Sequence, residues 1–114
     1  MRILISYEES YRTYGDMLER AIGGLRPEAD VASCRLAEIA EQVESFDAHL
    51  VVSSDSNSVD PVGRTAWYRL SLEPDEPSEA CLGGQRWQRL DPTLDELLLF
   101  IDEAEALVDS GHAV

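Results

Sequence analysis

The chain has 114 residues, enough for one domain with its own core and too few for two. Its nine basic residues are all arginine, and 23 Asp and Glu residues bring the net charge to −14. Such a surface repels phosphate backbones and anionic lipid headgroups, which disfavours nucleic-acid and membrane-surface binding. Because the chain has no lysine, Schiff-base chemistry and a P-loop are excluded.

Cysteine content and hydropathy point to a cytoplasmic protein. Cys34 and Cys81 lie far apart without a nearby Cys or His partner, as expected for small buried side chains in a reducing compartment. No segment approaches the ~20 apolar residues that span a bilayer, and the N-terminus carries no secretory signal pattern. We expect one domain over residues 1–108, followed by a flexible tail over 109–114.

The first half of the chain alternates between apolar runs and stretches with helical spacing. In chain order these are a strand at 2–6, a helix at 10–25, a strand at 29–34, a helix at 36–46, and a buried strand within 46–55. Ser10 is the expected cap of the first helix, and Pro27 follows its end. The predicted apolar stripe of this helix is Tyr14, Met17, Leu18, Ala21, Ile22 and Leu25. Strands and helices that alternate with short connections predict a parallel sheet with right-handed crossovers.

The second half has a different pattern. Residues 53–64 and 73–78 are rich in turn formers and predict loops, while 66–72 alternates like a strand. Gly83-Gly84 between two short runs indicates a hairpin, so we expect antiparallel or edge strands here. Thr93 and Glu96 form a capping box for a final helix. Its predicted apolar stripe is Leu94, Leu97, Leu98, Ile101, Ala104, Leu107 and Val108.

Together these elements predict a three-layer α/β domain of flavodoxin-like type with a shortened, partly antiparallel second half. The runs at 2–5 and 46–52 and the pattern at 94–98 resemble the receiver domain of bacterial response regulators. In that family, an acidic pair after the first strand holds Mg²⁺ and an Asp ending the third strand accepts a phosphoryl group.

The chain departs from the receiver pattern at each of these positions. Ser6 and Tyr7 align with the acidic pair, and Ser53 and Ser54 stand where the third strand ends. Glu8 and Glu9 follow slightly late, as does Asp55, and no lysine exists to complete the site. The resemblance therefore implies a degenerate receiver, since the charges that stabilise phosphoryl transfer are missing.

Two ligand-binding alternatives involve the same sheet edge. The first strand and the hydroxyls of Ser10 and Thr13 near Gly15 resemble a flavodoxin phosphate loop, which would bind FMN, although Tyr11 and Arg12 interrupt it. Alternatively, Glu8, Glu9 and Asp55 converge on a divalent cation, with Asp55 as a divergent phosphoacceptor. Because acidic residues are abundant, solvated loop charges are the simpler interpretation.

Two other groups of residues invite a functional interpretation. Four residues of strand separate His49 from Ser53 by about 13 Å, so a catalytic triad with Asp55 is not expected. The aromatic side chains of Trp67, Tyr68 and Trp87 either pack in the core or form an exposed partner surface. The arginines of this half are expected to pair with carboxylates; they are Arg64, Arg69, Arg86 and Arg89.

The sequence thus favours a non-enzymatic, receiver-like signalling or protein-interaction module without cofactor or metal. The partner is a protein or a second copy of the chain. The residues predicted to contact a ligand or partner are Glu8, Glu9, Ser53, Ser54, Asp55, Trp67 and Trp87.

Overall fold

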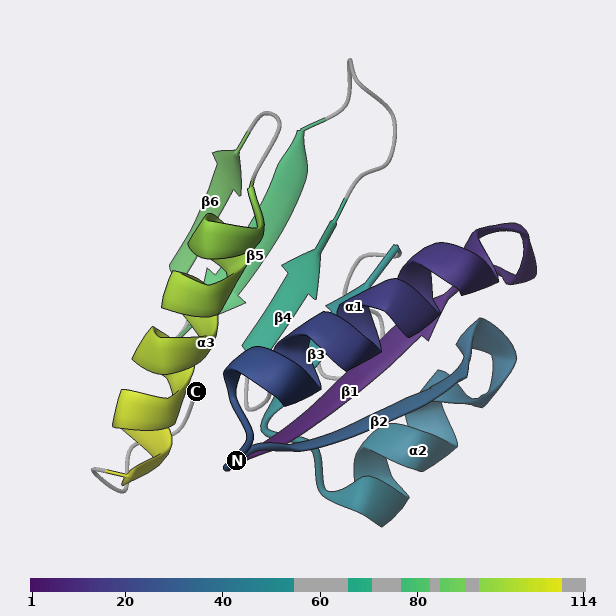
Figure 1. Ribbon diagram of the computed structural model, residues 1–114, viewed down its shortest axis with the longest axis horizontal. Helices are drawn as coiled ribbons and strands as arrows, with labels where there is room; N and C mark the ends of the chain where they lie inside the picture. Colours follow the sequence, from purple (N-terminus) through teal and green to yellow (C-terminus); the bar gives the residue numbers. More distant parts are fainter. Residues whose placement is uncertain (55–65, 71–76, 83–84, 90–92, 110–114) are drawn as a thin grey trace.

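The computed structural model describes residues 1–54, 66–70, 77–82, 85–89 and 93–109, apart from the side chains of Trp87 and Arg89. Within them the chain is an α/β protein with a six-stranded mixed sheet and three α-helices (Figure 1). The strands are β1 (Arg2–Tyr7), β2 (Asp30–Arg35), β3 (Leu50–Ser53), β4 (Ala66–Arg69), β5 (Ser78–Leu82) and β6 (Gln85–Arg89). The helices are α1 (Arg12–Leu25), α2 (Ile39–Phe46) and α3 (Leu94–Asp109).

The strand order is β2-β1-β3-β4-β5-β6. The first four of these strands are parallel, whereas β5 and β6 are antiparallel to their neighbours. The predicted hairpin is confirmed by the pairing of β5 with β6, although Gly83-Gly84 lies outside the described residues. The expectation of only antiparallel or edge strands after residue 55 was wrong for β4. The connection between Ser53 and Ala66 is long enough to return the chain to the opposite sheet edge, as parallel pairing requires.

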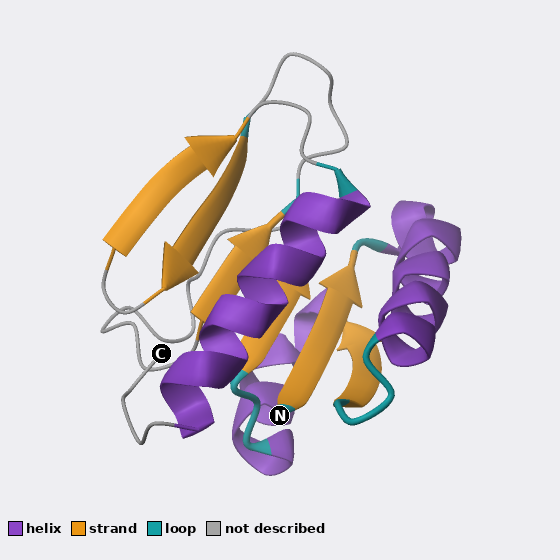
Figure 2. Cartoon of the chain, turned by 60° about the vertical axis from the view of Figure 1, so that its left-hand side comes forward, coloured by secondary structure: helices purple, strands orange, loops and turns teal. Residues whose placement is uncertain are grey.

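Helices cover both faces of the sheet, as Figure 2 shows. Helices α1 and α3 pack on the face that carries Ile3, Ile5 and Val52, while α2 packs on the face that carries Leu4 and Val51. Strand β3 is buried on both faces because it lies in the centre of the sheet. Its continuous apolar sequence follows from this position.

Helix α1 begins two residues later than predicted. Residues Glu9–Tyr11 form a 3-10 turn, and Tyr11 occupies the cap position without a side-chain hydrogen bond, so Ser10 is not the cap. Leu18 and Ile22 are buried as expected, but Met17 and Leu25 are 59% and 50% exposed. The apolar stripe predicted for this helix is wider than the face that is buried, because α1 contacts the sheet along a narrower strip of its surface.

Local contacts set the end of α2 and the start of α3. Asp47 follows α2 with a positive φ of 54°, a left-handed conformation that stops the helix before β3 begins at Leu50. At α3 the predicted cap is confirmed, since the backbone N–H of Glu96 donates to Oγ1 of Thr93 at 3.2 Å. Leu94 is exposed, contrary to its predicted core position, whereas Phe100 is buried.

In the ranges that the structure describes, no helix is both long and apolar enough to cross a membrane.

Candidate functional site

A row of polar side chains crosses the sheet where the parallel strands end. Cys34, Ser6, Ser53 and Arg69 are direct neighbours in register on β2, β1, β3 and β4. Strand alternation puts all four on the α2 face, because Leu4, Val51 and Trp67, two residues earlier, pack there. Ser6 and Ser53, the centre of the row, are therefore adjacent at the sheet edge where the receiver resemblance places its site.

The two serines belong to the packed interior of the sheet. Both are fully buried, and the hydroxyl of Ser6 donates to the backbone carbonyl of Cys34 at 3.2 Å. The N–H of Ser54 donates to the carbonyl of Ser6 at 3.3 Å, and the N–H of Leu70 donates to the carbonyl of Ser53 at 2.8 Å. The two backbone hydrogen bonds continue the sheet past the strand ends, and the hydroxyl of Ser6 is engaged within the sheet.

Arg69 brings a positive charge to this row. Its side chain is half-buried, and Nη2 donates to the carbonyl of Pro77 at 3.0 Å. Its neighbour in register on β5 is Glu79, which lies 3.8 Å from Arg86. The predicted arginine–carboxylate pairing is thus confirmed for Arg86. Arg64 and the side chain of Arg89 lie outside the described residues.

Of the alternative acidic cluster, the structure describes only Glu8 and Glu9. Glu8 and Glu9 are exposed, and Glu9 lies 3.6 Å from Arg12 in a solvent-accessible ion pair. Asp55 lies outside the described residues. Among the described residues, no group of three His, Cys, Asp or Glu side chains is placed to hold a metal ion.

The tryptophan hypothesis is corrected in part. Trp67 is 2% exposed and packs beneath α2, so it does not present a partner surface. The neighbouring Tyr68 packs against Phe100 of α3, with ring centroids 5.0 Å apart. Both side chains are therefore core residues, in agreement with the core-packing alternative. The side chain of Trp87 lies outside the described residues.

His49 lies at the opposite, amino end of the sheet, so it has no role beside Ser53. Its Nδ1 accepts a hydrogen bond from the backbone N–H of Arg2 at 3.0 Å. Arg2 also pairs with the carboxylate of Asp47 at 2.9 Å. Burial and the Arg2 guanidinium lower the pKa of His49 below its ordinary value, which favours the neutral imidazole that this contact needs.

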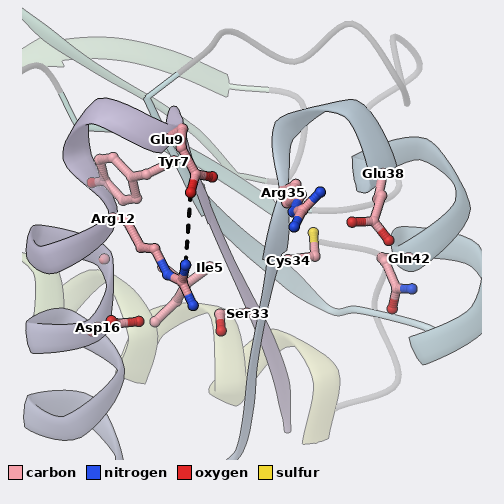
Figure 3. Close-up of a pocket in the computed structure, with 11 residues that line it drawn as sticks. Ile5, Tyr7, Glu9, Arg12, Asp16, Ser33, Cys34, Arg35, Glu38 and Gln42 are labelled. Carbon is pink, nitrogen blue, oxygen red and sulfur yellow. Dashed lines mark ion pairs between the residues drawn. The ribbon is translucent and has the colours of Figure 1, made fainter.

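A cavity of about 300 Å³ lies beside the carboxyl ends of β1 and β2 (Figure 3). The first turns of α1 and the residues before it form one wall, with Glu9, Arg12 and Asp16. Strand β2 and the segment after it form the other wall, with Arg35 and Glu38. Sequence reasoning gave Glu9 a functional role but not the other four, because they are far apart in the chain and follow no motif.

Two features shape the cavity. The first is Gly15 on α1, which is buried against the ring of Tyr7; a Cβ there would lie 3.4 Å from the ring, in van der Waals contact. The second is Cys34, a lining residue whose side chain packs on the α2 face and whose thiol pKa is raised by burial. A thiol that stays protonated at neutral pH is a poor nucleophile, so the cavity offers binding groups more readily than reactive ones.

The chain matches no protein-family model, and comparisons with curated proteins and with solved structures also give no match.

Proposed function

We propose that the chain is a non-enzymatic, receiver-like module of flavodoxin-like fold that signals or assembles through protein contacts and has lost the phosphoacceptor site. The single observation that supports this proposal is the buried pair Ser6 and Ser53. The two serines are neighbours in register at the positions where a receiver would carry carboxylates.

Physical chemistry disfavours phosphoryl transfer at this pair. Transfer from a small donor needs a cation to neutralise the developing charge on the phosphoryl oxygens. The hydroxyl of Ser6 is already engaged with the carbonyl of Cys34, and both serines are shielded from solvent. The sequence contains no lysine to take part.

The test is incubation of the protein with acetyl phosphate and Mg²⁺, followed by intact-mass spectrometry. We expect no phosphoryl adduct under conditions in which a competent receiver domain, included as the positive control, is fully modified. A stoichiometric adduct mapped by peptide mass spectrometry to Ser53, Ser54 or Asp55 would refute the proposal and favour the divergent phosphoacceptor.

As part of this proposal, the partner contact is assigned to exposed apolar side chains of α1 and α3. Met17, Leu25 and Leu99 on these helices are at least half exposed, at 59%, 50% and 63%. Between the two partner classes, a different protein is favoured over a second copy, because two chains of net charge −14 repel each other.

A further inference from the structure

The cavity between α1 and β2 has the size and chemistry of a small-ligand site. Its volume of about 300 Å³ is at the lower end of the range for ligand pockets in proteins. Its charged side chains are exposed, so the cavity is open to solvent and a small polar molecule can enter it directly.

The strand register explains why charged groups gather here. Ser33 and Arg35 pair with Ile5 and Tyr7, so alternation turns them to the α1 face of the sheet. On α1, Arg12 and Asp16 are one turn apart and face the same space. In Figure 3, β2 runs between the side chains of α1 and those of Arg35 and Glu38.

Positively and negatively charged side chains both line this cavity. Arg12 lies 3.6 Å from Glu9, whereas Arg35 forms no ion pair with any residue of the described ranges. Asp16 and Glu38 add a carboxylate to each wall. A simple anion would meet these carboxylates and a simple cation would meet the two guanidinium groups, so either ligand is opposed by like charge.

We propose that this cavity binds a small zwitterion of the free α-amino-acid type. The ligand carboxylate lies between the guanidinium groups of Arg12 and Arg35, which suit planar, bidentate recognition of carboxylates. The ligand ammonium group faces the carboxylate of Glu38. The site goes beyond the proposed protein-interaction function and does not depend on it, because none of its contacts uses Ser53 or the exposed apolar side chains.

The test uses ¹H–¹⁵N correlation NMR of the full chain, with each of the common amino acids added singly up to about 10 mM. We expect saturable shifts from at least one amino acid, at the amides of residues 9–16 and 33–38. For that amino acid, the N-acetyl derivative removes the ammonium charge and the C-terminal amide removes the carboxylate. Each change is expected to weaken binding about tenfold or more.

Matched variants distinguish the loss of a direct contact with the ligand from a change in the overall charge of the protein. Arg35→Gln and Glu38→Gln are expected to weaken the amino acid about tenfold, whereas Arg20→Gln, an exposed arginine on α1 outside the cavity, leaves its affinity unchanged. The spectra of the free variants show whether each one is folded. The proposal is overturned if no amino acid gives saturable shifts, if the N-acetyl derivative or acetate binds equally well, or if Arg20→Gln weakens binding as much as Arg35→Gln.

Discussion

At the scale of single residues, the buried hydroxyl of Tyr7 lowers the stability of the folded protein. Its side chain is 7% exposed, and its buried hydroxyl has no hydrogen-bond partner in the described part of the chain. Burial raises the pKa of this hydroxyl, as do the neighbouring Tyr14 and Tyr68. Removing an unsatisfied buried polar group is favourable, so Tyr7→Phe is expected to stabilise the protein by about 1 kcal/mol in urea unfolding. The control Tyr14→Phe, at a half-buried position, should change little; a destabilised Tyr7→Phe would mean that the hydroxyl has a partner.

His49 makes the stability depend on pH. Because burial and Arg2 lower its pKa in the folded state, the unfolded chain takes up a proton more readily than the native protein. The contribution of His49 to the free energy of unfolding is therefore complete above pH 6.5, the ordinary pKa of histidine. It is lost as the pH falls through the lower pKa that His49 has in the folded state. His49→Asn retains an acceptor for Arg2 but does not titrate. Between about pH 7.5 and about pH 5.5, the free energy of unfolding in urea should fall less for the variant than for the wild type. Equal decreases would contradict the prediction.

At the scale of elements, one ion pair joins α1 to α3. The guanidinium of Arg26, which follows α1, donates to both carboxylate oxygens of Asp102 at 2.7 and 2.8 Å. This hydrogen bonding lowers the pKa of Asp102 below its ordinary value of 3.8. A carboxyl group whose pKa is lower in the folded state than in the unfolded chain stabilises the protein at any pH above its unfolded-state pKa. This stabilisation is lost as the pH falls through the folded-state pKa.

A double-mutant cycle of Arg26→Gln and Asp102→Asn measures this contact. We expect a favourable coupling energy at neutral pH that disappears once Asp102 is protonated, as followed by urea unfolding. The pair is partly exposed, so the coupling is expected to be small and sensitive to salt. The pair Arg2→Gln and Asp102→Asn provides the control, because Arg2 pairs with Asp47 instead. A coupling that is absent at neutral pH would show that packing alone joins the two helices.

At the scale of the whole molecule, the net charge of −14 sets the response to salt. Like charges across a small domain oppose compaction, and raising the salt from about 10 mM to about 150 mM shortens the Debye length from about 30 Å to about 8 Å. The melting temperature is therefore expected to rise over this interval. Repeating the scan with potassium in place of sodium separates screening from specific cation binding. A falling melting temperature would mean that attractive pairs such as Arg26–Asp102 outweigh the repulsion.

The candidate site could be predicted only in part. The sequence indicated that Ser6 and Ser53 lie at the ends of two central strands, and the parallel pairing of β1 with β3 makes them neighbours. It did not indicate Arg69 as part of the same row, because the direction of β4 depends on the connection before it. The buried position of Trp67 also follows from packing under α2, which alternation along one strand does not reveal.

By itself the sequence determined the order and type of the described elements, the cap of α3 and the acidic character of the chain. Apolar periodicity, capping groups and charge act over a few residues, so they can be read locally. Only the tertiary structure decided which helix faces stay exposed, which way β4 runs, and that Arg12 and Arg35 share one cavity. These outcomes depend on contacts between residues distant in the chain, and they arise when the sheet assembles.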